Sequence, residues 1–302
     1  MRIEIVTVPY RYDEFNQGLG AGPQALISAG VASRIAAAGH EVANPVAASL
    51  DSSKKESGQT AINIGRLGSS TALLVADARN RDSAVVCLTG DDTAAIGVVA
   101  GLQQAHGASV KIGVIWIDAH GDFNTPQTSF SGILAGMPVA VLTGLAGPRW
   151  RDAAGQLAVV PTDRILIAGV RDLDNQEESL LKATAATVLN GAQARALTPF
   201  TDAVNELASR CDLLYLHLDL DVLDPELVPS ASTPSPLGLD IKTVSAMMSA
   251  AYDTGAVAAT SFSSLNPGGG RLGQRSISTT LALIERATAA WSATPTLDAA
   301  RA

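Results

Sequence analysis

The stretch "VIWIDAHGDFNTP" at residues 114–126 joins an apolar run to a cluster of polar side chains. Its first four residues are apolar or aromatic, as in a buried strand, and Asp118, His120 and Asp122 follow at alternate positions. Alternate residues of an extended chain point to the same side, so we expect the two carboxylates and the imidazole to share a focus. Such a focus indicates a functional site.

Two further acidic segments follow apolar runs. "LHLDLDVLDP" contains His217, Asp219 and Asp221, and "CLTGDD" ends at Asp91 and Asp92. In open parallel sheets, ligands bind beyond the carboxyl ends of the strands, where loops bring polar groups together over a rigid floor. We therefore expect the three acidic segments to meet at one edge of a sheet.

The rest of the chain alternates between strand-like and helix-like patterns. Longer Ala- and Leu-rich stretches, such as residues 22–40 and 275–291, have the apolar spacing of amphipathic helices. Between such stretches, short runs rich in β-branched residues predict strands at 2–8, 83–88, 111–117, 164–170, 213–221 and 256–262. This alternation predicts an α/β protein, with a mostly parallel central sheet covered by helices on both faces.

No linker or internal repeat divides the sequence, so we predict one domain spanning residues 1–302. Residues 51–59, "DSSKKESGQ", are predicted to be a polar surface loop or a mobile segment. The tail at about residues 293–302 contains a proline and no apolar period, so we expect it to be frayed.

The composition excludes several classes of partner. A formal charge of −8, from 21 basic and 29 acidic residues, opposes binding to nucleic acid or to anionic membranes and favours a small or cationic ligand. No apolar run approaches the ~20 residues of a membrane helix, and the N-terminus lacks the pattern of a signal peptide. Cys87 and Cys211 lie in or beside apolar runs, which predicts free thiols and a cytoplasmic protein.

The density of carboxylates predicts a metal site. Uncompensated carboxylates packed this closely would repel one another and would be costly to desolvate, and one or two divalent cations remove both costs. Oxygen-rich ligation with one or two imidazoles suits Mn²⁺ best, while Mg²⁺, Fe²⁺, Co²⁺, Ni²⁺ and Zn²⁺ remain open. A single Asp-x-Asp pattern is usually a solvated loop or an Asx-turn. Two such clusters at strand ends favour the metal site over that structural interpretation.

The remaining histidines are less informative. His40 and His106 each precede a predicted strand within a polar turn, where a structural role is expected. His217 should face the same way as Asp219, but it lies two residues deeper in the strand. Its role stays open between a ligand and a hydrogen-bonding group beneath the metal floor.

These motifs resemble those of the ureohydrolase superfamily of arginase, agmatinase and formiminoglutamase. "DAHGDFNTP" is similar to the family's DAHxDxNTP segment, and "LDLDVLDP" is similar to its SFDxDxxDP segment. The resemblance extends from "GLGAGPQALISAG" near the N-terminus, through "GVRDLD", to "SLNPGGG" near the C-terminus. It implies an arginase-like three-layer α/β/α fold, two Mn²⁺ ions per subunit, hydrolysis of a linear amidine C–N bond, and a homotrimer or homohexamer.

The resemblance also assigns metal ligands. The first metal would be held by Asp118, His120, Asp219 and Asp221. The second would share Asp118 and Asp219 and add Asp122, together with the histidine of a GGDH motif. This chain reads "TGDD" there, so Asp92 replaces that histidine. A carboxylate still binds Mn²⁺ at a similar distance, although its shorter arm has to be met by loop adjustment or a bridging water, which leaves a weaker second site open.

In the family, a hydroxide that bridges the metals attacks the amidine carbon, and Asp122 would hold that hydroxide and pass its proton to the leaving amine. With Asp122, His120 completes the predicted catalytic pair. Two other family residues are replaced here: Ser264 in "SSLNP" stands where a glutamate secures the guanidinium, and Ala135 in "SGILAGMP" stands where arginases have a histidine proposed as a proton shuttle.

The replacements predict an unusual substrate. Without a carboxylate at position 264, a buried guanidinium lacks its charge partner, and breaking such a pair costs several kcal/mol. Plain arginine is therefore disfavoured, and an N-hydroxyguanidine, an acylguanidine, a formimino or a ureido group fits better. By resemblance, an amino-acid-like substrate would be bound by Asn124, Ser131 and Thr233 at its carboxylate and, at its amino group, by the region of Asp172, Asp174 and Glu177. Ordinary turn or helix-cap chemistry is the alternative for each of these residues.

Two alternatives stay open at this point. The changed positions are also consistent with a metal-binding, catalytically silent subunit with a regulatory or structural role. Deacetylases that share this general fold use a single zinc with an Asp, His, Asp set and a His-His pair, and no adjacent histidines occur in this sequence. Amide deacetylation is therefore the weaker alternative.

Overall fold

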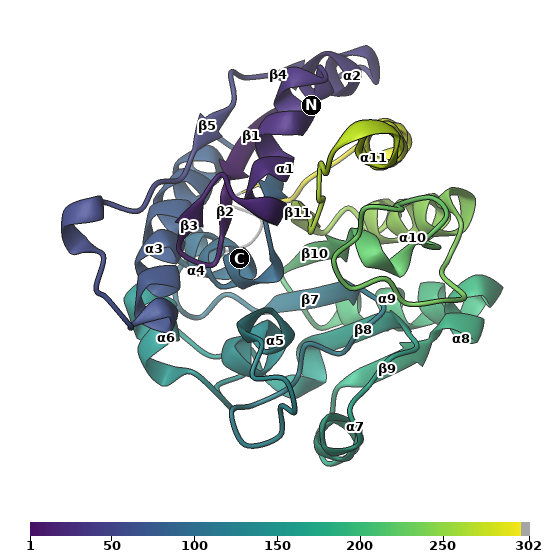
Figure 1. Cartoon of the computed structure of the whole chain (residues 1–302). Helices are drawn as coiled ribbons and strands as arrows, with labels where there is room; N and C mark the ends of the chain where they lie inside the picture. The colour runs from purple at the N-terminus through teal and green to yellow at the C-terminus, as the bar shows by residue number, and fades with distance from the viewer. Residues whose placement is uncertain (297–302) are drawn as a thin grey trace.

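The computed structural model describes residues 1–296 and contains one large parallel sheet (Figure 1). Every pairing in this nine-stranded sheet is parallel. Its strands in spatial order are β4 (Glu41–Val42), β1 (Arg2–Val8), β6 (Ala84–Thr89), β11 (Val257–Ser263), β10 (Leu213–Asp219), β7 (Ile112–Ile117), β8 (Ile165–Val170) and β9 (Thr187–Asn190), and β5 (Val46–Ala47) also pairs with β1.

Helices cover both faces of this sheet, which confirms the predicted three-layer α/β/α architecture. One core is formed with α1 (Gly22–Ser28), α2 (Val31–Ala37), α8 (Gly191–Ala196), α9 (Thr198–Ser209), α10 (Ile241–Asp253) and α11 (Gly270–Ala290). The opposite core is formed with α3 (Thr60–Arg79), α4 (Ala95–His106), α5 (Pro138–Leu142), α6 (Pro148–Ala154) and α7 (Asn175–Lys182).

The central strands are apolar on both sides because each strand contributes to both cores. In β7, for example, Ile115 and Ile117 join one core, whereas Val114 and Trp116 join the other. This is the residue pattern of a parallel sheet covered on both faces. The resulting rigid layer supports the loops at its carboxyl edge.

The six predicted strands correspond to β1, β6, β7, β8, β10 and β11, while the short outer strands β4, β5 and β9 were missed. The stretch 22–40 forms two helices rather than one, because Gly30 between them adopts a left-handed conformation with φ 82°. A two-stranded antiparallel hairpin, β2 (Tyr10–Arg11) and β3 (Glu14–Phe15), lies apart from the large sheet. Within residues 1–296, no helix has the length and hydropathy that crossing a bilayer requires.

The two predicted polar segments differ in outcome. Residues 51–59 are exposed throughout, as expected of a surface loop. The predicted frayed tail lies partly outside the described residues, at 297–302, but its first part is anchored: the Thr294 hydroxyl donates to the Val257 carbonyl over 3.0 Å and Arg79 donates to the Pro295 carbonyl. The single domain over residues 1–302 stays a prediction.

Candidate metal centre and active site

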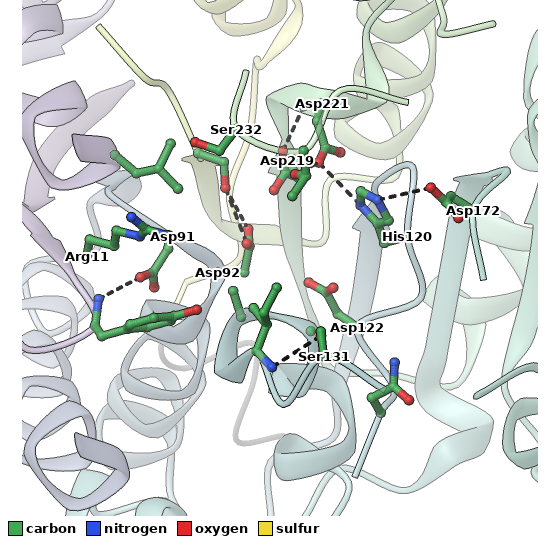
Figure 2. Close-up of a pocket in the computed structure, with 18 of the residues that line it drawn as sticks. Arg11, Asp91, Asp92, His120, Asp122, Ser131, Asp172, Asp219, Asp221 and Ser232 are labelled. Carbon is green, nitrogen blue, oxygen red and sulfur yellow. Dashed lines mark hydrogen bonds and ion pairs between the residues drawn. The ribbon is translucent and has the colours of Figure 1, made fainter. Parts of the chain in front are cut away.

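The three acidic segments meet over the carboxyl ends of four neighbouring strands, β6, β11, β10 and β7. A cavity of about 240 Å³ opens between them and is lined by acidic side chains from each of the three segments (Figure 2). Strand order explains this convergence, because β6 and β7 lie on either side of the adjacent pair β11 and β10 in the sheet, although both are far from that pair in sequence.

Asp118, His120 and Asp122 converge, but not by the alternation of an extended chain. Strand β7 ends at Ile117, and the residues that follow form bends. The His120 backbone N–H donates to Asp118 Oδ1 over 2.8 Å, and the Trp116 indole N–H donates to Asp118 Oδ2 over 3.0 Å. The predicted mechanism of convergence is therefore wrong, because an Asx-turn rather than a continued strand brings the side chains together.

Asp122 is placed by a strained turn. Its backbone adopts φ 47°, a left-handed conformation that is uncommon outside glycine and clusters at functional sites. The Val139 N–H donates to the Asp122 carbonyl over 2.9 Å, and the neighbouring Phe123 N–H donates to the buried Glu177 carboxylate over 2.8 Å. A side chain at Gly121 would meet Glu177 Oε1 at 2.8 Å, so the Glu177 carboxylate would have to shift from its place beneath the turn. Glu177 thus supports the turn.

The end of β10 repeats this design. The Asp221 N–H donates to Asp219 Oδ1 over 2.7 Å, and the Thr233 hydroxyl donates to Asp221 Oδ2 over 2.7 Å. Arg171 secures the same loop by donating to the Asp221 carbonyl over 2.7 Å. Here too a turn, the short 3-10 helix η6 (Leu220–Val222), replaces the predicted extended continuation to residue 221.

His120 connects the two loops. Its Nδ1 lies 3.3 Å from Asp118 Oδ1 and 3.2 Å from Asp221 Oδ2, while its Nε2 lies 3.9 Å from Asp172 Oδ2 (Figure 2). The ring is partly exposed, whereas Asp118 and Asp221 are buried. The nitrogen that faces these two carboxylates is therefore the one that can share a cation with them.

The two aspartates at the end of β6 have different roles. Asp91 accepts from the Tyr12 N–H over 2.7 Å and from the Thr93 N–H over 3.0 Å, so it is a structural turn residue. Asp92 begins the short helix η3 (Asp92–Ala94) and turns toward the cavity, where the Ser264 hydroxyl donates to its two oxygens over 3.3 and 3.2 Å. His217 Nε2 lies 3.0 Å from Asp92 Oδ1.

This contact resolves the role of His217. Its side chain lies beneath the cavity floor, 1% exposed, with its ring stacked on Trp116. Burial alone would raise the pKa of Asp92, but the hydrogen bond and charge of His217 act in the opposite direction and hold that pKa below its ordinary value. His217 therefore favours the ionised form of Asp92.

The other carboxylates experience the opposite effect. Burial raises the pKa of Asp118 to about 7, and the charge of Asp221 adds to the rise. Burial also raises the pKa of Asp122 well above its ordinary value, and the charge of Asp118 adds to the rise. The pKa of Asp219 is raised in the same way, first by burial and then by the charge of Asp221. Burial opposes ionisation of His120, but hydrogen bonds to Asp118 and Asp221 prevail and raise its pKa to about 12. The protonated form of His120 alone does not balance the negative charge of the surrounding carboxylates.

A divalent cation fits this cluster. Ligand atoms of Asp118, His120 and Asp221 lie within 4.8 Å of one another, and so do those of Asp92, Asp118 and Asp122. Two buried oxygens, Asp122 Oδ2 and Asp221 Oδ1, have no hydrogen-bond partner within the described chain. Buried unpaired carboxylate oxygens are costly, and coordination to a cation removes that cost.

The six residues predicted to bind substrate all line the cavity, namely Asn124, Ser131, Asp172, Asp174, Thr233 and Ser264. Several also contact protein groups: Asn124 donates to Asp174 over 3.3 Å, and Thr233 and Ser264 donate to Asp221 and Asp92. Asp174 occupies the N-cap position of α7 but makes no capping hydrogen bond with its side chain. Ala135 lines the cavity as well.

Sequence reasoning missed Arg11 and Tyr12 of the β2–β3 hairpin, which also line the cavity. Among the described residues that line it, Arg11 is the one lysine or arginine, and Figure 2 shows it across the cavity from Asp172. Arg11 stands alone before a polar turn in the sequence, so no motif indicated that it would line the cavity. The predicted structural roles of His40 and His106 agree with their contacts to the Thr288 carbonyl over 2.7 Å and to Arg79 over 3.3 Å.

Known proteins match this chain over nearly its whole length. The chain is 28% identical over 270 residues to the arginase of Bacillus subtilis strain 168, covering 88% of this chain and 90% of that protein. The crystal structure of arginase from Bacillus cereus superposes with a TM-score of 0.83 at 26% identity, covering 95% and 98%. The crystal structure of formimidoylglutamase from Bacillus subtilis shares the fold, with a TM-score of 0.72 at 15% identity. The match covers 96% of this chain and 88% of that chain. Since the model of the Arginase family matches residues 1–289, this chain belongs to the arginase family.

Proposed function

We propose that this chain is a metal-dependent hydrolase that cleaves a linear amidine- or guanidine-type C–N bond in a modified amino acid rather than in plain arginine. One observation carries the proposal. A buried cluster of carboxylates around His120 has unpartnered oxygens suited to divalent cations, while Asp92 and Ser264, which bond to each other, differ from the family motif.

We infer two Mn²⁺ sites in this cluster. The first would be held by Asp118, His120, Asp219 and Asp221, and the second by Asp92, Asp118, Asp122 and Asp219. Oxygen-rich ligand sets of this kind suit Mn²⁺. When bound, the metals would supply a hydrolytic nucleophile at neutral pH and neutralise the charge that develops on the substrate.

Asp122 and His120 are the proposed catalytic residues. Asp122 Oδ2 is buried, unpartnered and part of the cavity wall, and burial raises the pKa of its carboxyl. These properties suit a group that takes a proton from the attacking water and gives it to the leaving amine nitrogen. His120 would act through the first metal, which its Nδ1 would hold together with the facing carboxylates of Asp118 and Asp221.

The changed wall of the cavity sets the proposed substrate. Ser264 offers a hydroxyl where a guanidinium would need a carboxylate, and this hydroxyl already donates to Asp92. The methyl group of Ala135 cannot shuttle a proton. A less basic group, such as an N-hydroxyguanidine, acylguanidine, formimino or ureido group, depends less on a buried counter-charge.

The polar groups around Asp174 at the cavity wall support an amino-acid substrate. Asp172 and Asp174 would attract an ammonium group, while Asn124, which donates to Asp174, and Ser131 would receive the carboxylate on the same carbon. The Thr233 hydroxyl is engaged by Asp221, so it would act on the substrate only through that residue.

The test is a substrate panel with defined metal content. Purified protein is stripped of metal, loaded with MnCl₂, and incubated with guanidino, N-hydroxyguanidino, acylguanidino, ureido and formimino amino acids, while release of urea, hydroxyurea or ammonia is measured. Turnover of a modified compound in preference to arginine supports the proposal. Binding of one or two Mn²⁺ per chain without turnover of any compound would instead favour the catalytically silent subunit.

We further propose that the chain binds a small-molecule substrate and neither nucleic acid nor membranes. We also propose that it assembles as a homotrimer or homohexamer, as the family resemblance implies. Cys87 and Cys211 are free thiols, which supports a cytoplasmic location. Light scattering on the Mn²⁺-loaded protein would measure the subunit number.

A further inference from the structure

A buried stack of side chains lies directly beneath Asp92. The ring of His217 lies 3.6 Å from that of Trp116, centroid to centroid, with 11° between their planes. His217 Nε2 lies 3.0 Å from Asp92 Oδ1, and Nδ1 lies 3.0 Å from the Tyr215 hydroxyl, which in turn lies 2.7 Å from the Ser261 hydroxyl. All these side chains are buried. Such packing leaves the imidazole a single orientation.

The direction of the contact with Asp92 is also defined. Both Asp92 oxygens accept from the Ser264 hydroxyl, and a carboxylate that ligates a metal is ionised and only accepts hydrogen bonds, so His217 Nε2 must donate to Asp92. The Tyr215 hydroxyl can donate to Nδ1 or accept from it. Both the neutral and the protonated imidazole therefore keep the Nε2–H directed at Asp92. Trp116, on which the ring stacks, donates to Asp118 over 3.0 Å, so one stacked pair supports carboxylates from two strand ends.

From the other side, Ser264 donates to Asp92 over 3.3 and 3.2 Å. A glutamate at position 264 would instead bring a second carboxylate toward Asp92, where neither could donate to the other. The replacements at positions 92 and 264 are therefore compatible with one another. With aspartate at position 92, serine at position 264 provides a hydrogen-bond donor where glutamate would place a second carboxylate. His217 supplies the second donor that a carboxylate at position 92 requires.

We propose that His217 is a positioning residue that orients Asp92 as a ligand of the second metal, so that Asp92, His217 and Ser264 act as one unit in place of a ligand histidine. This inference rests on the proposed function, because it concerns the second site of the same metal centre. Position 92 lacks the ligand imidazole of the family motif, and the imidazole of His217 lies directly beneath Asp92, where it orients this carboxylate ligand. Hydrogen-bonded groups behind a metal ligand commonly change metal affinity about 10- to 100-fold.

The test measures manganese binding directly. Metal-free full-length protein is dialysed against MnCl₂, bound manganese is counted per chain by elemental analysis, and both affinities are measured by titration calorimetry. The wild-type chain is expected to bind two Mn²⁺. His217→Ala should keep the first affinity and weaken the second roughly 10- to 100-fold. His217→Gln, whose amide can still donate, should recover most of the lost affinity.

A double variant separates positioning from general structural support. Asp92→His together with His217→Ala provides an imidazole ligand that needs no donor beneath it and removes a ring to make room. Its second site should return toward wild-type affinity. If His217 acts only by supporting the fold, the double variant will remain as weak as His217→Ala, and both will lower the melting temperature of the metal-free protein.

The outcomes are distinguishable. A wild-type chain that binds two Mn²⁺, with both affinities unchanged in His217→Ala, would overturn this inference and leave the proposed function intact. Failure of the double variant to regain the second site would also overturn it. A wild-type chain that binds no Mn²⁺ would overturn the proposed function, and this inference with it.

Discussion

The candidate metal centre has two unlike halves. Over β7 and β10, Asp118, His120 and Asp221 match the family motif, and backbone N–H groups and tight turns hold them. Over β6 and β11, Asp92 and Ser264 depart from that motif and are held by side chains, mainly the buried imidazole beneath. The first half can be read from a motif because local turns build it. The second depends on contacts between distant segments, and we propose that it determines the substrate.

The largest expected effect is the loss of metal binding when a ligand in the first half is removed. Asp219→Ala removes a proposed ligand of both metals and should abolish Mn²⁺ binding, whereas Asp92→Ala should remove only the second ion. Elemental analysis after dialysis measures this as ions per chain. Asp224→Asn is the matched control, since Asp224 lies in the same segment but does not line the cavity, and it should retain both ions. Equal losses in Asp219→Ala and Asp92→Ala would contradict the shared-ligand assignment.

The next effect concerns proton transfer. Asp122→Asn keeps the size of the side chain but removes the group that accepts the proton, so kcat on the best panel substrate should fall by about 10²- to 10⁴-fold. Steady-state kinetics at saturating Mn²⁺ measures this, with KM expected to change much less. An Asp122→Asn enzyme that retains wild-type kcat would exclude Asp122 from proton transfer.

A smaller effect sharpens the contrast at the second half. In an Asp92→His background, which removes the carboxylate that would face it, Ser264→Glu adds the carboxylate that a guanidinium requires, so kcat/KM for arginine relative to the best modified substrate should rise roughly tenfold over Asp92→His alone, equivalent to about 1.4 kcal/mol. Ser264→Gln in the same background has nearly the same size without the charge and should leave the ratio unchanged. A similar rise in both variants would show that size rather than charge sets the preference.

The smallest effect tests a support of the first half. Thr233→Val removes the hydroxyl that donates to Asp221 Oδ2, a hydrogen bond expected to contribute about 1 kcal/mol, or roughly fivefold in affinity for the first Mn²⁺. Titration calorimetry measures the change, and Ser232→Ala, a neighbouring residue of the cavity wall, serves as the control. An unchanged first affinity in Thr233→Val would mean that the turn alone positions Asp221.

Much of the fold could be predicted from the sequence, because strands buried on both faces leave continuous apolar runs such as "KIGVIWI". The outer strand β9 was missed because only Leu189 of its four residues is buried, so its pattern is weak. Within the site, the convergence of Asp118, His120 and Asp122 was predicted, but its mechanism was not. Apolar and polar alternation carries no information about the left-handed backbone of Asp122.

The contacts of His217 and Arg11 could not be predicted from the sequence for a different reason. His217 meets Asp92 across 125 positions of the chain, and only the order of the strands in the sheet brings them together. Arg11 reaches the cavity through a two-stranded hairpin whose placement depends on packing against the rest of the protein. Sequence spacing reports neighbours within one segment and is silent about such pairs.

The most direct test of the central claim is the ratio of kcat/KM for the best modified substrate to that for arginine, measured on one Mn²⁺-loaded preparation. Loss of a buried charge partner costs about 3–5 kcal/mol, so the ratio should be at least roughly a hundredfold in favour of the modified compound. A preparation with two Mn²⁺ per chain that hydrolyses arginine faster than every modified compound would contradict the account.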